Sequence, residues 1–69
     1  MTVKNFLGSY NIGRSAINTA TVIDQDGEGY TFSKRELIAD AYGARGAWKI
    51  RTFTITTDNI VIYTNGGQQ

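Results

Sequence analysis

The stretch DQDGEGYTFSKREL, residues 24–37, spaces its acidic side chains as a calcium-binding loop does. An EF-hand loop needs oxygen ligands at positions 1, 3 and 5, glycine at position 6 and a bidentate glutamate at position 12. The matching positions hold carboxylates and the glycine: Asp24, Asp26, Glu28 and Gly29. Position 12, however, is Arg35, and Glu36 arrives one residue late. Because the decisive ligand is missing, we expect an acidic hairpin turn, no metal site and no cofactor.

A second stretch, ARGAWKIR, residues 44–51, places basic side chains around a tryptophan. Arg45, Lys49 and Arg51 surround Trp48, and no acid occurs between residues 41 and 57. Basic groups interleaved with an aromatic ring can hold phosphates and stack a base. Tryptophan with arginine also marks the centres of protein interfaces. Alternatively, Trp48 anchors the core while its basic neighbours keep an edge strand from aggregating.

Lys34 and Arg35 are placed against the dipole of the helix that we predict after Ser33. Cations are unfavourable in a first helical turn, where the backbone carries a partial positive charge. Either the acids Asp26 and Glu28 shield them, or the two cations and the free N–H groups form an anion-binding corner. We therefore include Lys34 and Arg35 with the basic cluster as candidate partner-binding residues.

The chain contains few of the side chains that catalysis commonly uses. It contains no histidine and no cysteine, so the usual general base and the thiol nucleophile are both missing. The aspartates nearest in sequence, Asp24 and Asp26, lie in a polar turn that offers no burial to raise a pKa. We expect a protein that is not an enzyme.

The elements that position these residues follow from periodicity. Residues 16–23 are rich in β-branched types and predict a strand, although both of its faces carry apolar groups. The turn at 24–29 and the short strand YTF complete a hairpin. Ser33 and Glu36 then form a capping box that opens a helix over about 33–42, which Gly43 ends. Its apolar stripe consists of Leu37, Ile38, Ala41 and Tyr42.

Residues 48–64 predict a second hairpin with its turn at TDN, because Phe53 and Ile55 alternate with threonines and Ile60 and Ile62 alternate with Val61 and Tyr63. The threonine row faces solvent or a partner. Residues 2–14 show no clear pattern, since Gly8 and Gly13 interrupt it. We predict a small α+β domain of order β-β-α-β-β over residues 1–64, in which two antiparallel hairpins form one sheet and the helix packs on one face. Residues 65–69 form a flexible tail.

Size and charge narrow the classes of function that we expect for this chain. Sixty-nine residues make one domain, the formal net charge is +1, and no apolar run approaches the ~20 residues of a membrane span. We expect a cytoplasmic, non-enzymatic protein-binding module, an inhibitor or regulator that docks on a larger protein partner through its basic and aromatic surface. By analogy of size and composition, we expect the type of accessory protein that phages and mobile elements encode. The alternative is a nucleic-acid-binding module that uses the same basic residues on phosphates. A homodimer would give so small a chain additional apolar burial.

Overall fold

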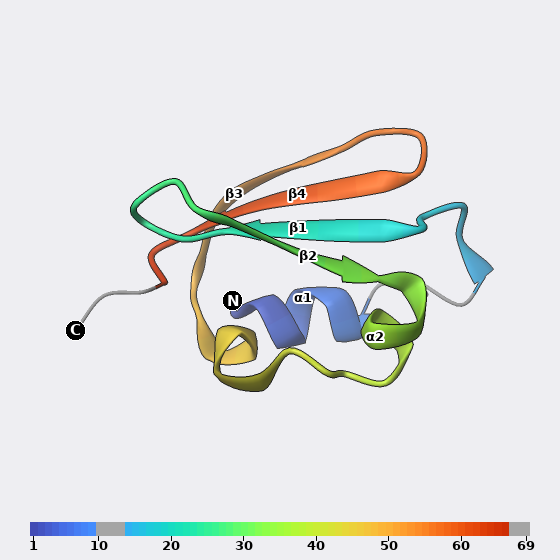
Figure 1. Cartoon of the computed structure of the whole chain (residues 1–69), viewed down its shortest axis with the longest axis horizontal. Coiled ribbons are helices and arrows are strands. Elements are labelled where there is room, and N and C mark those ends of the chain that lie inside the picture. Colours follow the sequence, from blue (N-terminus) through green and yellow to red (C-terminus); the bar gives the residue numbers. More distant parts are fainter. Residues whose placement is uncertain (10–13, 67–69) are drawn as a thin grey trace.

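The computed structural model describes residues 1–9 and 14–66, and it places the helices on one face of a four-stranded sheet (Figure 1). The predicted α+β class is confirmed. The elements in chain order are α1 (Val3–Ser9), β1 (Thr19–Ile23), β2 (Gly29–Ser33), α2 (Lys34–Ile38), the 3₁₀ helix η2 (Gly43–Ala47), β3 (Ile50–Ile55) and β4 (Asn59–Thr64).

The sheet joins the two predicted hairpins through a parallel central pair. Its strand order is β2-β1-β4-β3, with β1–β2 and β3–β4 antiparallel. Between them, β1 and β4 run parallel, with Thr21 opposite Val61. The sheet is therefore mixed, which the local patterns of the two hairpins did not indicate.

The core lies between the sheet and the helices. Ala20 and Val22 of β1 and Ile60 and Ile62 of β4 are buried on the covered face, which answers which side of residues 16–23 is buried. Buried residues from the other elements complete the core: Val3, Leu7, Ile17, Phe32, Leu37 and Tyr42.

Helix α1 occupies part of the segment in which the sequence showed no clear pattern. Val3 and Leu7 are buried one helical turn apart, and Phe6 packs beside them on the core. Thr2 precedes the helix, and its Oγ1 accepts a hydrogen bond from the Asn5 N–H at 3.2 Å. Residues 10–13 of the same segment lie outside the described residues.

Helix α2 begins as predicted but ends earlier. Both bonds of the Ser33–Glu36 capping box are present. The helix stops at Ile38, not near residue 42, because Asp40 adopts a left-handed backbone with φ of 55°. Ala41 N–H then donates to the Glu36 carbonyl at 3.0 Å and Asp40 N–H to the Leu37 carbonyl at 3.3 Å, which is a Schellman motif. The predicted apolar stripe is wrong at Ile38 and Ala41, which are both exposed.

Packed structure continues past the end of β4 to Gly66, although we expected a flexible tail from residue 65. Asn65 N–H donates to the Lys49 carbonyl at 3.1 Å, and Gln25 N–H donates to the carbonyl of the buried Gly66 at 3.0 Å. Residues 67–69 of the expected tail lie outside the described residues. Within the described ranges, no helix is long and apolar enough to span a membrane.

Candidate functional site

The six predicted partner-binding residues fall into two groups. Arg45, Trp48, Lys49 and Arg51 lie in η2, its continuation and the start of β3. Lys34 and Arg35 are the first residues of α2, which follows the C-terminal end of β2. Arg45 stacks on Tyr30, which lies near the other end of β2. Four residues of extended strand separate Tyr30 from Lys34, roughly 13 Å. The fold therefore places the two groups toward opposite ends of β2.

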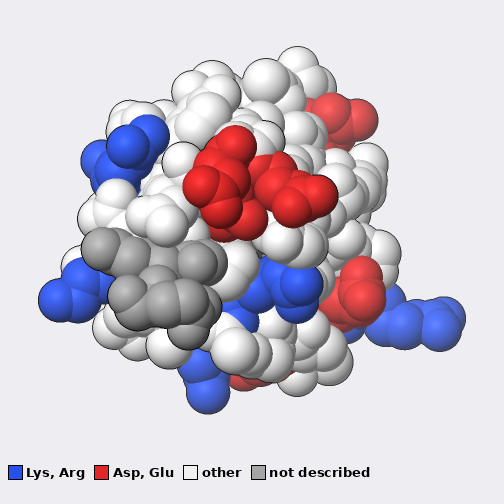
Figure 2. All heavy atoms as spheres, turned by 60° about the vertical axis from the view of Figure 1, so that its left-hand side comes forward, with Lys and Arg blue, Asp and Glu red and all other residues white. Residues whose placement is uncertain are grey.

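The Lys34 side chain contacts the segment that precedes β1. Its Nζ donates to the Ser15 carbonyl at 3.2 Å, so the side chain is tied to the segment before β1. Asp26 and Glu28 lie in the β1–β2 turn, at the opposite end of β2. The expectation that these acids shield Lys34 and Arg35 is wrong, because the length of β2 separates the two pairs. Figure 2, in which the end of the molecule with this turn comes forward, shows acidic side chains gathered beside basic ones.

Arg45 belongs to a stack with two aromatic rings. Its guanidinium carbon lies 3.9 Å from the Tyr30 ring centre and 5.9 Å from that of Trp48. The two rings meet edge to face, with their centres 5.9 Å apart. Arg45 Nε is buried and has no hydrogen-bond partner among the described residues. Cation–π contact therefore holds this half-buried arginine in the fold, and less of its charge is presented to a partner.

Trp48 is a packing residue rather than an exposed anchor. The ring is half-buried against the core, and it lies so close to Gly66 that a Cβ there would overlap it. The Trp48 carbonyl accepts from the Val3 N–H at 2.9 Å, which ties α1 to the segment before β3. Of the alternatives for Trp48, the geometry matches the structural one.

Lys49 and Arg51 remain exposed at the start of β3. The register between β3 and β4 shifts at this point, since Ile50 pairs with Thr64 while Thr52 pairs with the adjacent Tyr63. Arg51 is thus the extra residue of a β-bulge and lies with Thr52 opposite Tyr63. The bulge places Arg51 at the edge of the sheet face that the helices do not cover.

The helices leave that face of the sheet uncovered, and we call it the open face. Residues that alternate with the buried ones line it, and the strand pairings bring them into rows. One row runs through Thr31, Thr21, Val61 and Thr54, and the next through Gly29, Ile23, Tyr63 and Thr52. The strand residues of this face include no Asp, Glu or Lys.

Two side-chain hydrogen bonds cross between the strands on the open face. Thr19 Oγ1 donates to Asn59 Oδ1 at 2.7 Å, and Thr21 and Thr31 share a hydrogen bond of 3.2 Å. At its centre, Ile23, Val61 and Tyr63 are already half-buried. The alternation of Val61 and Tyr63 was visible in the sequence. Their position beside β1 depends on the parallel pair, which was not.

The acidic turn that resembled a calcium loop uses its first aspartate to hold the backbone. Asp24 is buried, and its Oδ1 accepts from the N–H groups of Asp26 at 2.9 Å and Glu28 at 3.0 Å. Its Oδ2 accepts from the Tyr30 hydroxyl at 3.3 Å. In the described ranges, no group of three or more metal-ligating side chains could hold an ion. Turn formation accounts for Asp24 without a metal.

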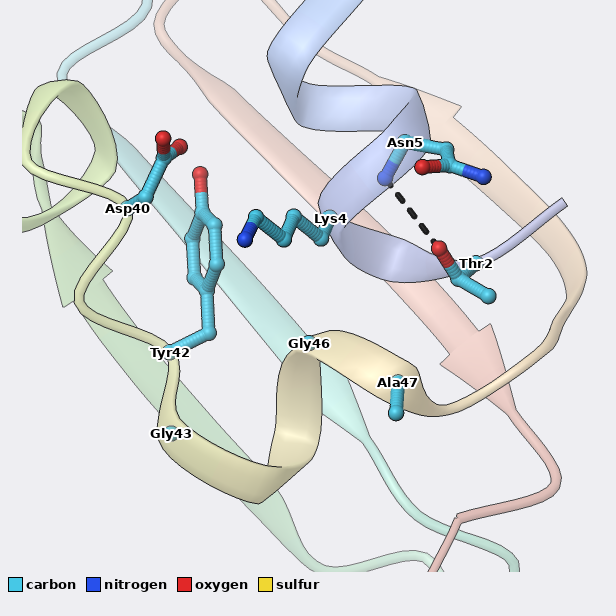
Figure 3. A pocket seen from close by; sticks show the side chains of 8 residues that line it. All are labelled: Thr2, Lys4, Asn5, Asp40, Tyr42, Gly43, Gly46 and Ala47. Atoms are coloured by element: carbon cyan, nitrogen blue, oxygen red, sulfur yellow. Dashed lines mark hydrogen bonds between the residues drawn. The ribbon is translucent and has the colours of Figure 1, made fainter.

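A pocket of about 460 Å³ opens between α1, the turn after α2 and η2 (Figure 3). Lys4 and Asp40 lie on opposite sides of the Tyr42 side chain. The Tyr42 hydroxyl donates to the Leu37 carbonyl at 3.1 Å. Burial, and to a lesser degree the Asp40 carboxylate, raise the pKa of Tyr42 above its usual 10.0. With its proton engaged and its pKa raised, this phenol is not prepared for acid–base chemistry near neutral pH.

Comparison with protein-family models, with curated proteins and with solved structures finds no match to this chain.

Proposed function

We propose that the protein is a non-enzymatic binding module, a small inhibitor or regulator that docks on a larger protein through the open face and its basic rim, Lys49 and Arg51. One observation carries the proposal: all described helices lie on one side of the sheet, so four strands present an uncharged face without cover (Figure 1). An uncovered sheet face that consists of hydroxyl and apolar groups suits a partner better than it suits a substrate.

The composition of the open face supports docking on protein. Interface centres are depleted of charged residues and enriched in tyrosine and arginine. Here Tyr63 and Val61 lie at the centre, and Arg51 lies at the edge. Because the Thr19 hydroxyl already donates to Asn59, removing water from it upon docking leaves no unsatisfied donor there. The desolvation cost of burying this face is correspondingly reduced.

The charges of the rim indicate the chemistry that we expect of the partner. Lys49 and Arg51 are exposed, and the nearest strand residues of the open face carry no charge. A partner with an apolar and hydroxyl-rich centre and acidic groups on one side would match this pattern. Rim charges act mainly on orientation and on the rate of association.

Capture of lysate proteins by the chain and by its variants tests the proposal. The immobilised chain is exposed to lysate of the cells that produce it, with and without nuclease, and bound proteins are compared between variants. Thr31→Glu places a charge on the open face, and Thr57→Glu places the same charge in the β3–β4 turn as a control; both positions are exposed. We expect a protein that survives nuclease and moderate salt to be lost with Thr31→Glu and retained with Thr57→Glu.

Three results would contradict the proposal. Retention of the same partner by Thr31→Glu would remove the open face from the interface. Release of all bound material by nuclease, with binding that falls steeply as salt rises, would favour the nucleic-acid alternative. Binding lost equally in both Thr→Glu variants would show a general charge effect rather than a docking face.

A further inference from the structure

The outer edge of β3 presents unpaired backbone groups. β3 is the last strand of the sheet. Its far side is paired only at the start, where Ile50 N–H donates to the Met1 carbonyl at 2.9 Å and Thr2 forms a bridge with Lys49. Thr56 N–H donates to the Asn59 carbonyl at 2.8 Å, so residue 56 faces β4. Antiparallel ladders alternate, so Thr54 also faces β4, while the N–H and C=O groups of Phe53 and Ile55 point to the outer edge.

This edge lacks the usual protection against pairing with another strand. Natural edge strands are protected by proline, by charge or by bulges. The chain has no proline, and the bulge at Arg51 disrupts only the beginning of β3. From Thr52 to Thr57 the sequence TFTITT is uncharged. Phe53 and Ile55 keep 45% and 41% of their surface exposed, although they lie on the covered face of the sheet.

We propose that two copies of this chain pair through β3 in antiparallel orientation, with Phe53 of each copy opposite Ile55 of the other. Two residues can pair directly only if they share a face, which Phe53 and Ile55 do. Both direct their backbone groups outward, so each such pair exchanges two hydrogen bonds. The twofold axis then passes beside Thr54, and the two sheets continue as one of eight strands.

Side chains near the axis suit this register. Apolar burial is added near the axis, because Phe6 packs on Phe53 with ring centres 4.6 Å apart. The pair thus brings apolar side chains together at its centre.

Sedimentation equilibrium of the full chain at high micromolar concentration tests the pairing. Ile55→Lys introduces a charge on the edge, and Ile38→Lys makes the same change on α2, where the side chain is 60% exposed. We expect the wild type and Ile38→Lys to sediment as dimers and Ile55→Lys as a monomer, all three with the same circular dichroism spectrum. A monomeric wild type would overturn the proposal and leave the edge to a foreign strand. A dimeric, folded Ile55→Lys would equally overturn it.

A single introduced cysteine tests the register of the proposed β3 pairing, since the natural chain has no cysteine. The proposed axis puts Thr54 opposite itself in a pair without hydrogen bonds, with Cα atoms about 4.5 Å apart. Mild oxidation of Thr54→Cys should therefore give a disulfide-linked dimer. In Thr52→Cys the two cysteines lie four residues apart along the strands, roughly 13 Å, and should remain reduced. Linkage at 52 but not at 54 would overturn the register. These variants leave Thr31 untouched, so failure of this pairing is distinguishable from failure of docking through the open face.

Discussion

The indole ring of Trp48 lies against the backbone of Gly66, in a space that only a residue without a side chain leaves open. This contact joins two segments that are distant in the sequence, the connection from η2 to β3 and the chain that leaves β4. Gly66 N–H donates to Thr64 Oγ1 at 3.0 Å, and that hydroxyl donates to the Ile23 carbonyl at 2.9 Å. The Trp48–Gly66 contact therefore closes the end of the domain over the β1–β2 turn.

Gly66→Ala should lower the free energy of unfolding by about 1–3 kcal/mol, because the new methyl group forces the ring of Trp48 out of its position. Urea denaturation followed by circular dichroism measures the change. Gly8→Ala is the matched control, since nothing lies within 4 Å of a Cβ at residue 8. Trp48→Ala should remove most of the cost of Gly66→Ala, and additive effects in the double mutant would contradict the contact.

Asp40→Gly should stabilise the protein by about 0.5–1 kcal/mol. Asp40 has φ of 55°, a conformation that costs an L-residue energy and that glycine adopts freely. An anion at the C-terminal end of α2 is also unfavourable with the helix dipole. Thermal denaturation measures the shift, with the exposed Ala41→Gly as control, which should destabilise or leave stability unchanged. A lower melting temperature for Asp40→Gly would show that its carboxylate stabilises the turn.

Stability should decrease above pH 10 through Tyr42. Burial raises the pKa of this phenol in the folded state, so the folded chain holds the proton more tightly than the unfolded chain does. The stability that this tighter proton binding contributes is complete below pH 10 and is lost as the pH rises through the raised pKa. Tyr42→Phe should cost about 0.5–1.5 kcal/mol at pH 7, through the lost bond to Leu37, and should flatten the decline at alkaline pH. Equal slopes for the two proteins in urea denaturation above pH 10 would refute this assignment.

Millimolar calcium should leave the melting temperature unchanged. The Asp24 carboxylate accepts hydrogen bonds from its own turn, and Arg35 occupies the position of the twelfth ligand. Amide shifts of Asp24, Asp26 and Glu28 recorded during a calcium titration provide the measurement, with magnesium as the comparison ion. A saturable shift confined to these residues would contradict the turn interpretation.

Local signals predicted much of the fold. Ser33 and Glu36 specify a capping box within four residues, and both of its hydrogen bonds form. Alternation in residues 48–64 likewise gave the second hairpin. Two features were missed although their signals are present: Val3, Phe6 and Leu7 have helical spacing, and Asp40 is one of the few residues that tolerate a left-handed turn.

Relationships between distant segments could not be predicted in the same way. Pairing of β1 with β4 joins residues about forty positions apart, and neither strand carries a local mark of it. The candidate site shows the same limit, because Lys34 and Arg45 were grouped by charge although the length of β2 keeps them apart. Trp48 was left open between core and interface, and only the backbone of Gly66 against its ring decides the matter.

Docking through the open face is tested most directly by recording amide chemical shifts of the labelled chain as the captured partner is added. We expect the largest changes at Thr21, Thr31, Val61 and Tyr63, with smaller ones at Lys49 and Arg51 and little change at Leu37 and Ala41. Changes concentrated on α2 or on the pocket around Tyr42, with the open face unaffected, would contradict the proposed docking surface.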